Sequence, residues 1–123
     1  YIFFLDAFKY DYRKYLNVEG VIQAYDALTP EERPTAFYVN SDQMAAELIK
    51  SFQRRGVDVP RDIEIIGFGD TMSASIVTPE LTTVALPIKE MGETAVSMLL
   101  DKIAGKQVGD MFFRLEMIKR ASA

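Results

Sequence analysis

The sequence has neither cysteine nor histidine among its 123 residues. Without cysteine, a disulfide framework and a thiolate metal site are both excluded, and the composition fits a reducing compartment such as the cytoplasm. Without histidine, the chain lacks the most common general base and the most common metal ligand. Apolar runs are also too short to span a bilayer, which takes about 20 residues. We therefore expect a protein without a metal, a cofactor or a membrane partner.

Positive charge is scarce and scattered along the chain. Lys and Arg number 14 against 18 Asp and Glu, which gives a net charge of −4. A domain that grips the phosphate backbone concentrates Lys and Arg on one face, so we expect this chain not to touch DNA itself. The apolar fraction of 49% is sufficient for a hydrophobic core in one small domain or lobe.

Short apolar runs alternate with longer stretches of helical periodicity, which is typical of an α/β fold with a parallel sheet flanked by helices. The expected strands are Tyr1–Leu5, Thr35–Val39, Ile63–Phe68, Leu81–Ala85 and Phe112–Lys119, and the expected helices are Asn17–Leu28, Ser41–Arg55 and Pro87–Ala104. Residues 71–79 are expected to be irregular or briefly helical. Because Tyr1 already lies inside a strand pattern, we expect the natural start of the protein to lie upstream.

Two of the expected strands lead into residues that suit a ligand. In an open parallel sheet, ligands bind beyond the carboxyl ends of the strands. The strand ending at Val39 leads to Ser41 and Asp42 at a helix start, where free N–H groups and the helix dipole favour a bound oxygen or anion. The strand ending near Gly67 leads to Phe68-Gly69-Asp70, which offers an aromatic face, exposed backbone and a carboxylate.

Each of these residues also has a purely structural interpretation. Ser41 and Asp42 are suited to cap the helix rather than to contact a ligand. Asp70 is equally suited to cap the segment that follows it, and Phe68 to fill the core. Tyr15 is a further candidate, because its ring can cover the C–H face of a sugar or serve as a half-buried staple before the first helix.

A catalytic interpretation has little support. Ser41 as a nucleophile would need an activating base, and the chain has no histidine to provide one. The run Gly67-Phe68-Gly69 is too short for a dinucleotide-binding glycine loop. A small α/β enzyme would show turnover that depends on Asp42 or Asp70, and we expect a binding protein instead.

A series of short motifs follows in order from Pro34 to the end of the chain. The motifs are Pro34–Phe37, Asn40–Ala45, Arg55–Ile63, Ile65–Asp70, Pro79–Val84, the helix residues Gly92, Ala95, Leu99 and Leu100, and Arg120–Ser122. In this order and spacing they resemble the LacI/GalR family of bacterial transcription regulators. Residues 1–33 resemble the family only loosely, around Glu19 and Gly20.

The resemblance implies the C-terminal lobe of a periplasmic-binding-protein-like type I fold, which closes with a second lobe on a small effector, usually a sugar or a nucleobase. Residues 1–123 would be a partial effector-binding domain, with residues 87–104 packed on the missing N-terminal lobe. A homodimer would contact operator DNA only through N-terminal heads that are absent here. The expected effector-binding residues are Tyr15, Ser41, Asp42, Phe68, Gly69 and Asp70. The dimer interface is expected near Ala45, Ala46 and Val77.

Three positions depart from the family pattern. Ser41, Gly69 and Leu86 stand where the family commonly places larger hydrogen-bonding side chains. Because a site built for hydroxyl groups discriminates through such side chains, we infer that the effector is not the commonest sugar type or that it bonds mainly through the other lobe. The alternative is a sugar-binding protein of a transport system, which shares the fold, but the motif series and the Arg-x-Ser ending favour the regulator.

Overall fold

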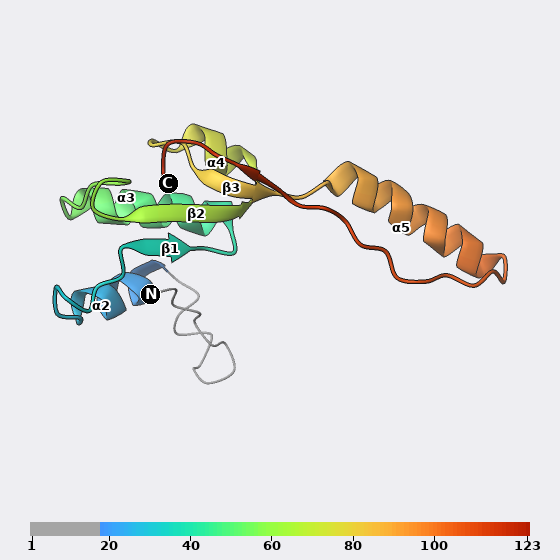
Figure 1. The fold of residues 1–123 in the computed structure, drawn as a ribbon, viewed down its shortest axis with the longest axis horizontal. Helices are drawn as coiled ribbons and strands as arrows, with labels where there is room; N and C mark the ends of the chain where they lie inside the picture. Colours follow the sequence, from blue (N-terminus) through green and yellow to red (C-terminus); the bar gives the residue numbers. More distant parts are fainter. Residues whose placement is uncertain (1–17) are drawn as a thin grey trace.

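The fold is an α/β arrangement built on a four-stranded sheet, and the computed structural model describes residues 18–123. The elements in chain order are α2 (Val18–Asp26), β1 (Ala36–Tyr38), α3 (Asp42–Arg54), β2 (Glu64–Gly69), α4 (Met72–Ile76), β3 (Thr82–Ala85), α5 (Ile88–Ile103) and β4 (Glu116–Ile118) (Figure 1). Each overlaps a segment expected from the sequence. The expected strand Tyr1–Leu5 and the candidate Tyr15 lie outside the described residues.

The strands follow the order β1-β2-β3-β4 across the sheet. The first two pairs are parallel, as expected, whereas β4 pairs antiparallel with β3. The expected strand Phe112–Lys119 is shorter in the structure, because β4 pairs only with Thr83–Ala85. Pro87 follows closely and has no backbone N–H with which to continue the ladder, so residues 112–115 stay outside the sheet.

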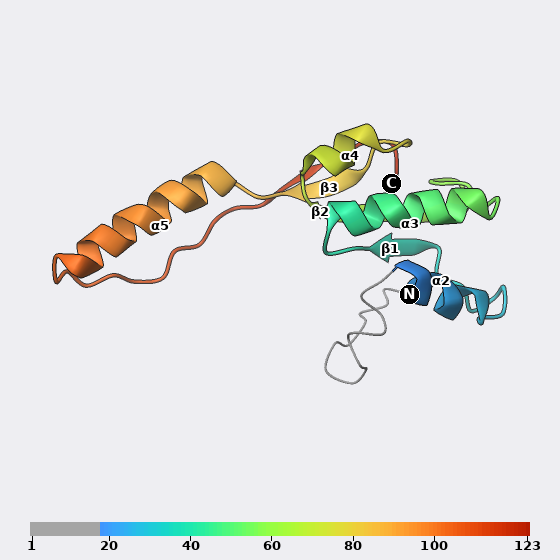
Figure 2. The ribbon, with the colours of Figure 1, turned by 180° about the vertical axis from the view of Figure 1, so that it is seen from behind.

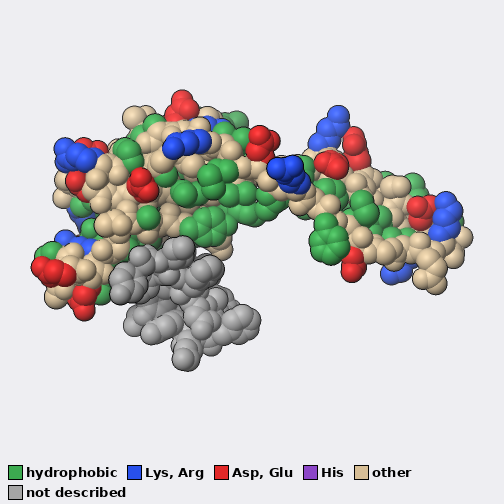
Figure 3. Space-filling model, viewed as in Figure 1, with side chains coloured by type: hydrophobic (Ala, Val, Ile, Leu, Met, Phe, Trp, Pro, Cys, Tyr) green, Lys and Arg blue, Asp and Glu red, His purple; other side chains and the backbone are tan. Residues whose placement is uncertain are grey.

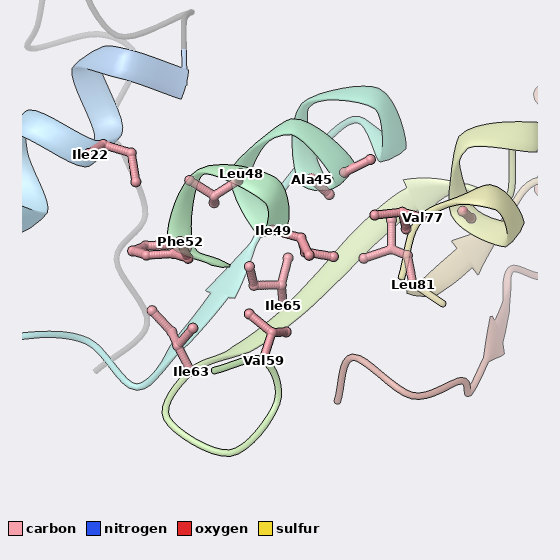
Figure 4. Close-up of a cluster of buried hydrophobic side chains, with 12 residues drawn as sticks. Ile22, Ala45, Leu48, Ile49, Phe52, Val59, Ile63, Ile65, Val77 and Leu81 are labelled. Carbon is pink, nitrogen blue, oxygen red and sulfur yellow. The ribbon is translucent and has the colours of Figure 1, made fainter. Parts of the chain in front are cut away.

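α3 covers one face of the sheet and supplies much of the core (Figures 1 and 2). Its apolar residues recur at helical spacing, so they form one buried stripe. The buried apolar side chains are Ile22, Ala45, Ala46, Leu48, Ile49, Phe52, Val59, Ile63, Ile65, Ala74, Val77 and Leu81 (Figure 4). The Phe52 ring meets Tyr25 edge-on at a centroid distance of 5.0 Å, which ties α2 to α3.

Ala45, Ala46 and Val77, near which the dimer interface is expected, have side chains that are buried within the chain itself. Their exposed fractions are 0%, 9% and 3%. The two alanines lie on the α3 stripe that faces the core, and Val77 packs into the same core just after α4. Side chains that are already covered by their own chain have almost no area left to bury against a partner.

Beyond β3 the chain extends away from the sheet as an arm (residues 86–115), made of α5 and the segment that returns from it (Figures 1 and 2). Pro87 precedes the helix and Gly105, with φ of +78°, follows it, as expected. No residue of α5 is buried, and Leu100 and Ile103 are 61% and 74% exposed. Apolar side chains lie along the arm and over the middle of the sheet face in Figure 3. Within residues 18–123, no helix has the length and apolar character to cross a membrane.

Candidate functional site

The loops that follow β1 and β2 lie side by side at one edge of the sheet. Because the two strands are parallel neighbours, with Tyr38 paired to Ile66, their carboxyl ends meet at the same edge. A hydrogen bond of 2.6 Å from the Thr71 backbone N–H to the Asp42 carboxylate joins the loops directly. We call residues 40–42 and 68–71 the two-loop site.

Asp42 holds the two loops together from inside the protein. Its exposed fraction is 1%. Oδ2 accepts the Thr71 backbone hydrogen bond, and Oδ1 accepts a 2.6 Å hydrogen bond from the Thr83 hydroxyl of β3. The position of Asp42 in the first turn of α3 places the carboxylate at the positive end of the helix dipole. Asp42 is therefore a buried support for the site, a role different from the helix cap or exposed contact considered from the sequence.

Gly67 provides the space that the Asp42 carboxylate occupies. A Cβ at this position would collide with Asp42 Oδ1 and would lie 2.6 Å from Leu81 Cδ2. No side chain fits in so small a gap. The absence of a side chain on β2 thus allows α3 and β3 to meet across the strand.

Ser41 occupies the N-cap position of α3, but its side chain makes no capping hydrogen bond. Its backbone is extended, with φ of −153° and ψ of 126°, and its carbonyl accepts the first helical hydrogen bond, from Ala45 N at 2.9 Å. The side chain is half-buried. Ser41 stands at the start of α3, where the first amides of the helix can donate hydrogen bonds to a ligand oxygen.

Phe68 lies on the sheet face opposite α3. Along β2, Ile65 and Gly67 are buried toward α3, and strand alternation directs Ile66 and Phe68 to the other face. The Phe68 ring meets that of Tyr38 edge-on at a centroid distance of 6.5 Å, and Tyr38 is 54% exposed. Phe68 is therefore a half-buried member of an aromatic pair, an intermediate between the core residue and the stacking surface expected from the sequence.

The second loop turns sharply through two residues with positive φ. Gly69 has φ of +123°, which favours glycine, and Asp70 has φ of +50°, a left-handed conformation that few other residues tolerate. The Asp70 carboxylate accepts a 2.7 Å hydrogen bond from Arg120 Nη2. The turn thus places an anchored carboxylate at the rim of the site.

Arg120 reaches this turn from the end of the chain. Its Nη1 donates to the Leu81 carbonyl at 2.9 Å, and its backbone N–H donates to the Thr82 hydroxyl at 2.9 Å. The Glu80 carboxylate lies 3.9 Å from Nε. Sequence reasoning missed both Arg120 and Thr83 as parts of the site, because they contact loop residues 50 and 41 positions away in the chain.

The polar groups of the two-loop site suit hydrogen bonding to a ligand. Its exposed or half-buried polar groups are those of Asn40, Ser41, Asp70 and Thr71. They provide hydrogen-bond donors and acceptors, and the Asp70 charge is paired with Arg120. No base is hydrogen-bonded to the Ser41 side chain within the described part of the chain, and no cluster of acidic residues there could hold a metal ion.

Comparison with known proteins identifies relatives of this architecture. Residues 6–122 match the periplasmic binding protein-like domain family. The chain is 41% identical over 95 residues to the arabinose metabolism transcriptional repressor of Geobacillus stearothermophilus, covering 75% of this chain and 26% of that protein. It is 38% identical over 96 residues to the catabolite control protein A of Priestia megaterium, covering 78% of this chain and 29% of the relative. The chain therefore spans little more than a quarter of the length of these curated relatives.

Solved structures give the same result. A LacI family transcriptional regulator from Bifidobacterium animalis subsp. lactis superposes with a TM-score of 0.76 at 32% identity, over 86% of this chain and 40% of that one. A LacI family regulator from Lactobacillus casei with bound sucrose superposes with a TM-score of 0.70 at 32% identity, over 87% of this chain and 41% of that one. These relatives are transcriptional regulators and not enzymes. The chain belongs to the periplasmic binding protein-like domain family and has LacI-family regulators as its homologues.

Proposed function

We propose that this chain is one lobe of the effector-binding domain of a LacI-type transcription regulator, and that its two-loop site forms one wall of the cleft in which the effector binds. The observation that carries the proposal is the Asp42–Thr71 hydrogen bond, which brings the loops after β1 and β2 together at one edge. If the loops lay at opposite ends of the sheet, they would have no cleft to share.

The effector best supported is a small neutral molecule rich in hydroxyl groups, of the sugar type. The site offers the Ser41 hydroxyl, the Asp70 carboxylate and exposed backbone, which suit alternating hydroxyl donors and acceptors. Pairing of Asp70 with Arg120 leaves no strong net charge to attract an anion or a cation. The relative from Lactobacillus casei with bound sucrose supports this class.

Binding residues in the proposed site are Ser41, Phe68, Gly69 and Asp70, with Asp42 in support; Tyr15 is a further candidate outside the described residues. The short side chains at Ser41 and Gly69, and Leu86 after β3, lead us to expect weak binding of galactosides. The protein acts in the cytoplasm without catalysis or a cofactor. It functions as a homodimer and reaches operator DNA only through an N-terminal head.

The arm completes this proposal. The apolar residues of α5 are uncovered in the chain, and a helix of this kind gains most of its stability from packing. We place α5 against the second lobe of the same domain. Closure of the two lobes on an effector then changes how the dimer presents its DNA-binding heads.

Titration calorimetry of the intact regulator with glucose, sucrose, cellobiose and a galactoside tests the proposal. We expect one of the first three to bind, and Ser41→Ala to weaken that binding by about tenfold, because a hydrogen bond in a buried site contributes about 1 kcal/mol or more. Ser75→Ala, which removes an exposed hydroxyl bonded within α4, is the matched control. Absence of binding to every sugar, or equal effects of the two substitutions, would contradict the proposal.

A further inference from the structure

We propose that Arg120 is the positioning residue of the two-loop site: its guanidinium holds the Asp70 turn in the shape that accepts the effector. The inference rests on the proposed function and adds a residue that does not itself touch the ligand. Three observations support it: the positive φ of Asp70, the hydrogen bonds that hold the Arg120 guanidinium, and the Asp70 carboxylate oxygen that Arg120 leaves unbonded.

The Asp70 turn needs an external restraint. A left-handed conformation is unfavourable for a non-glycine residue, so the φ of +50° at Asp70 is not the conformation that the isolated loop prefers. From the interior, the turn is held by the bond from the Thr71 backbone to Asp42. On the outer side, the only hydrogen bond to the Asp70 side chain within residues 18–123 comes from Arg120.

Arg120 is itself firmly anchored. The guanidinium binds the Leu81 carbonyl and Asp70 at once, and the backbone N–H of the same residue binds the Thr82 hydroxyl. Only 19% of its side chain is exposed. Because the planar fork of arginine uses two of its donors in fixed directions, it transfers the rigidity of β3 to the turn.

The contact leaves part of the Asp70 carboxylate available. Arg120 binds Oδ1, and Oδ2 accepts no hydrogen bond from any residue in the described part of the chain. A carboxylate fixed through one oxygen presents the other in a defined direction. A ligand hydroxyl then binds without the entropy cost of ordering the loop, which is the usual gain from a preorganised site.

Hydrogen exchange of the intact, ligand-free regulator tests the positioning directly. We expect Arg120→Met to raise the exchange rate of the backbone amides at residues 69–72 several-fold, because their local opening is no longer opposed by the ion pair. The exchange rates of the backbone amides in α3 should stay unchanged. Arg120→Lys should restore part of the protection, and Lys119→Met, which removes the neighbouring exposed charge, should have no effect. Unchanged exchange at residues 69–72 in Arg120→Met would overturn the inference.

A double-mutant cycle separates positioning from a general loss of structure. With a sugar that the wild type binds, Arg120→Met should weaken affinity about tenfold, and the same substitution should have little further effect in an Asp70→Gly background, which removes the carboxylate and tolerates the positive φ. An equal loss in both backgrounds would mean that Arg120 acts through the fold as a whole and would refute the inference. If the wild type binds no sugar, the proposed effector class fails, while the exchange experiment still decides the role of Arg120.

Discussion

Two replacements of Asp42 should separate what its hydrogen bonds contribute to the free energy of unfolding from what its charge contributes. The carboxylate is 1% exposed and accepts two hydrogen bonds of 2.6 Å. Hydrogen bonds to charged groups contribute about 1.5–3 kcal/mol each. Since Thr71 is exposed, water can reach its amide once the carboxylate is gone, whereas the Thr83 hydroxyl is fully buried. We therefore expect Asp42→Ala to lower the free energy of unfolding by about 3–4 kcal/mol.

Asp42→Asn should lower the free energy of unfolding much less than Asp42→Ala does. The amide oxygen can still accept from the Thr71 backbone, and the Thr83 hydroxyl can rotate to accept from the amide nitrogen, so only the charge assistance is lost, about 1 kcal/mol. Urea unfolding followed by circular dichroism, at matched protein concentrations, measures both variants. Glu47→Ala, an exposed carboxylate on the same helix, is the control. The argument that two hydrogen bonds make Asp42 stabilising would be refuted if Asp42→Asn and Asp42→Ala lowered the free energy of unfolding equally, or if Asp42→Ala lowered it by less than about 1 kcal/mol.

Three further predictions follow from other contacts. Ser122→Ala should lower the free energy of unfolding by about 2–3 kcal/mol, because the buried hydroxyl accepts from Thr82 N and donates to the Ile65 carbonyl. Urea unfolding measures this loss, and a smaller loss would mean that water replaces the hydroxyl. The pKa of Asp62 is lowered by hydrogen bonds from the Arg61 side chain and the Asp58 backbone N–H, so its stabilising contribution is present above its unfolded-state pKa and is lost as pH falls through the folded-state value. The difference in unfolding free energy between wild type and Asp62→Asn should accordingly vanish in acid, and a constant difference would contradict this. Finally, the uncovered apolar residues of α5 predict that the isolated chain self-associates, and sedimentation showing a clean monomer at high concentration would argue against that.

The order of helices and strands is predictable from the sequence because it depends on local patterns. The buried stripe of α3 follows the helical period, and Gly105 ends α5 through a positive φ that glycine adopts without strain. Parallel pairing of β1 and β2 also follows from the alternation of strands and helices, and it places the two candidate loops at one edge.

The roles of individual side chains are less predictable, because they depend on residues distant in the chain. Asp42 occupies a position in the sequence that is typical of a helix cap, yet its hydrogen-bond partners Thr71 and Thr83 lie 29 and 41 residues away. No local pattern distinguishes a carboxylate that caps a helix from one that links two loops. Ala45 and Ala46, near which the dimer interface is expected, are likewise buried, because α3 packs on strands that are distant in the chain.

The pairing of β3 with β4 has a mechanical consequence for the arm. The chain leaves the sheet along β3 and returns along its antiparallel neighbour β4, so the arm is attached by two adjacent strands. Because both attachments belong to one ladder, a shift of either strand within the sheet moves the arm as well. Because Arg120 lies two residues after β4, any displacement of the returning strand by the arm acts close to the residue that holds the Asp70 turn.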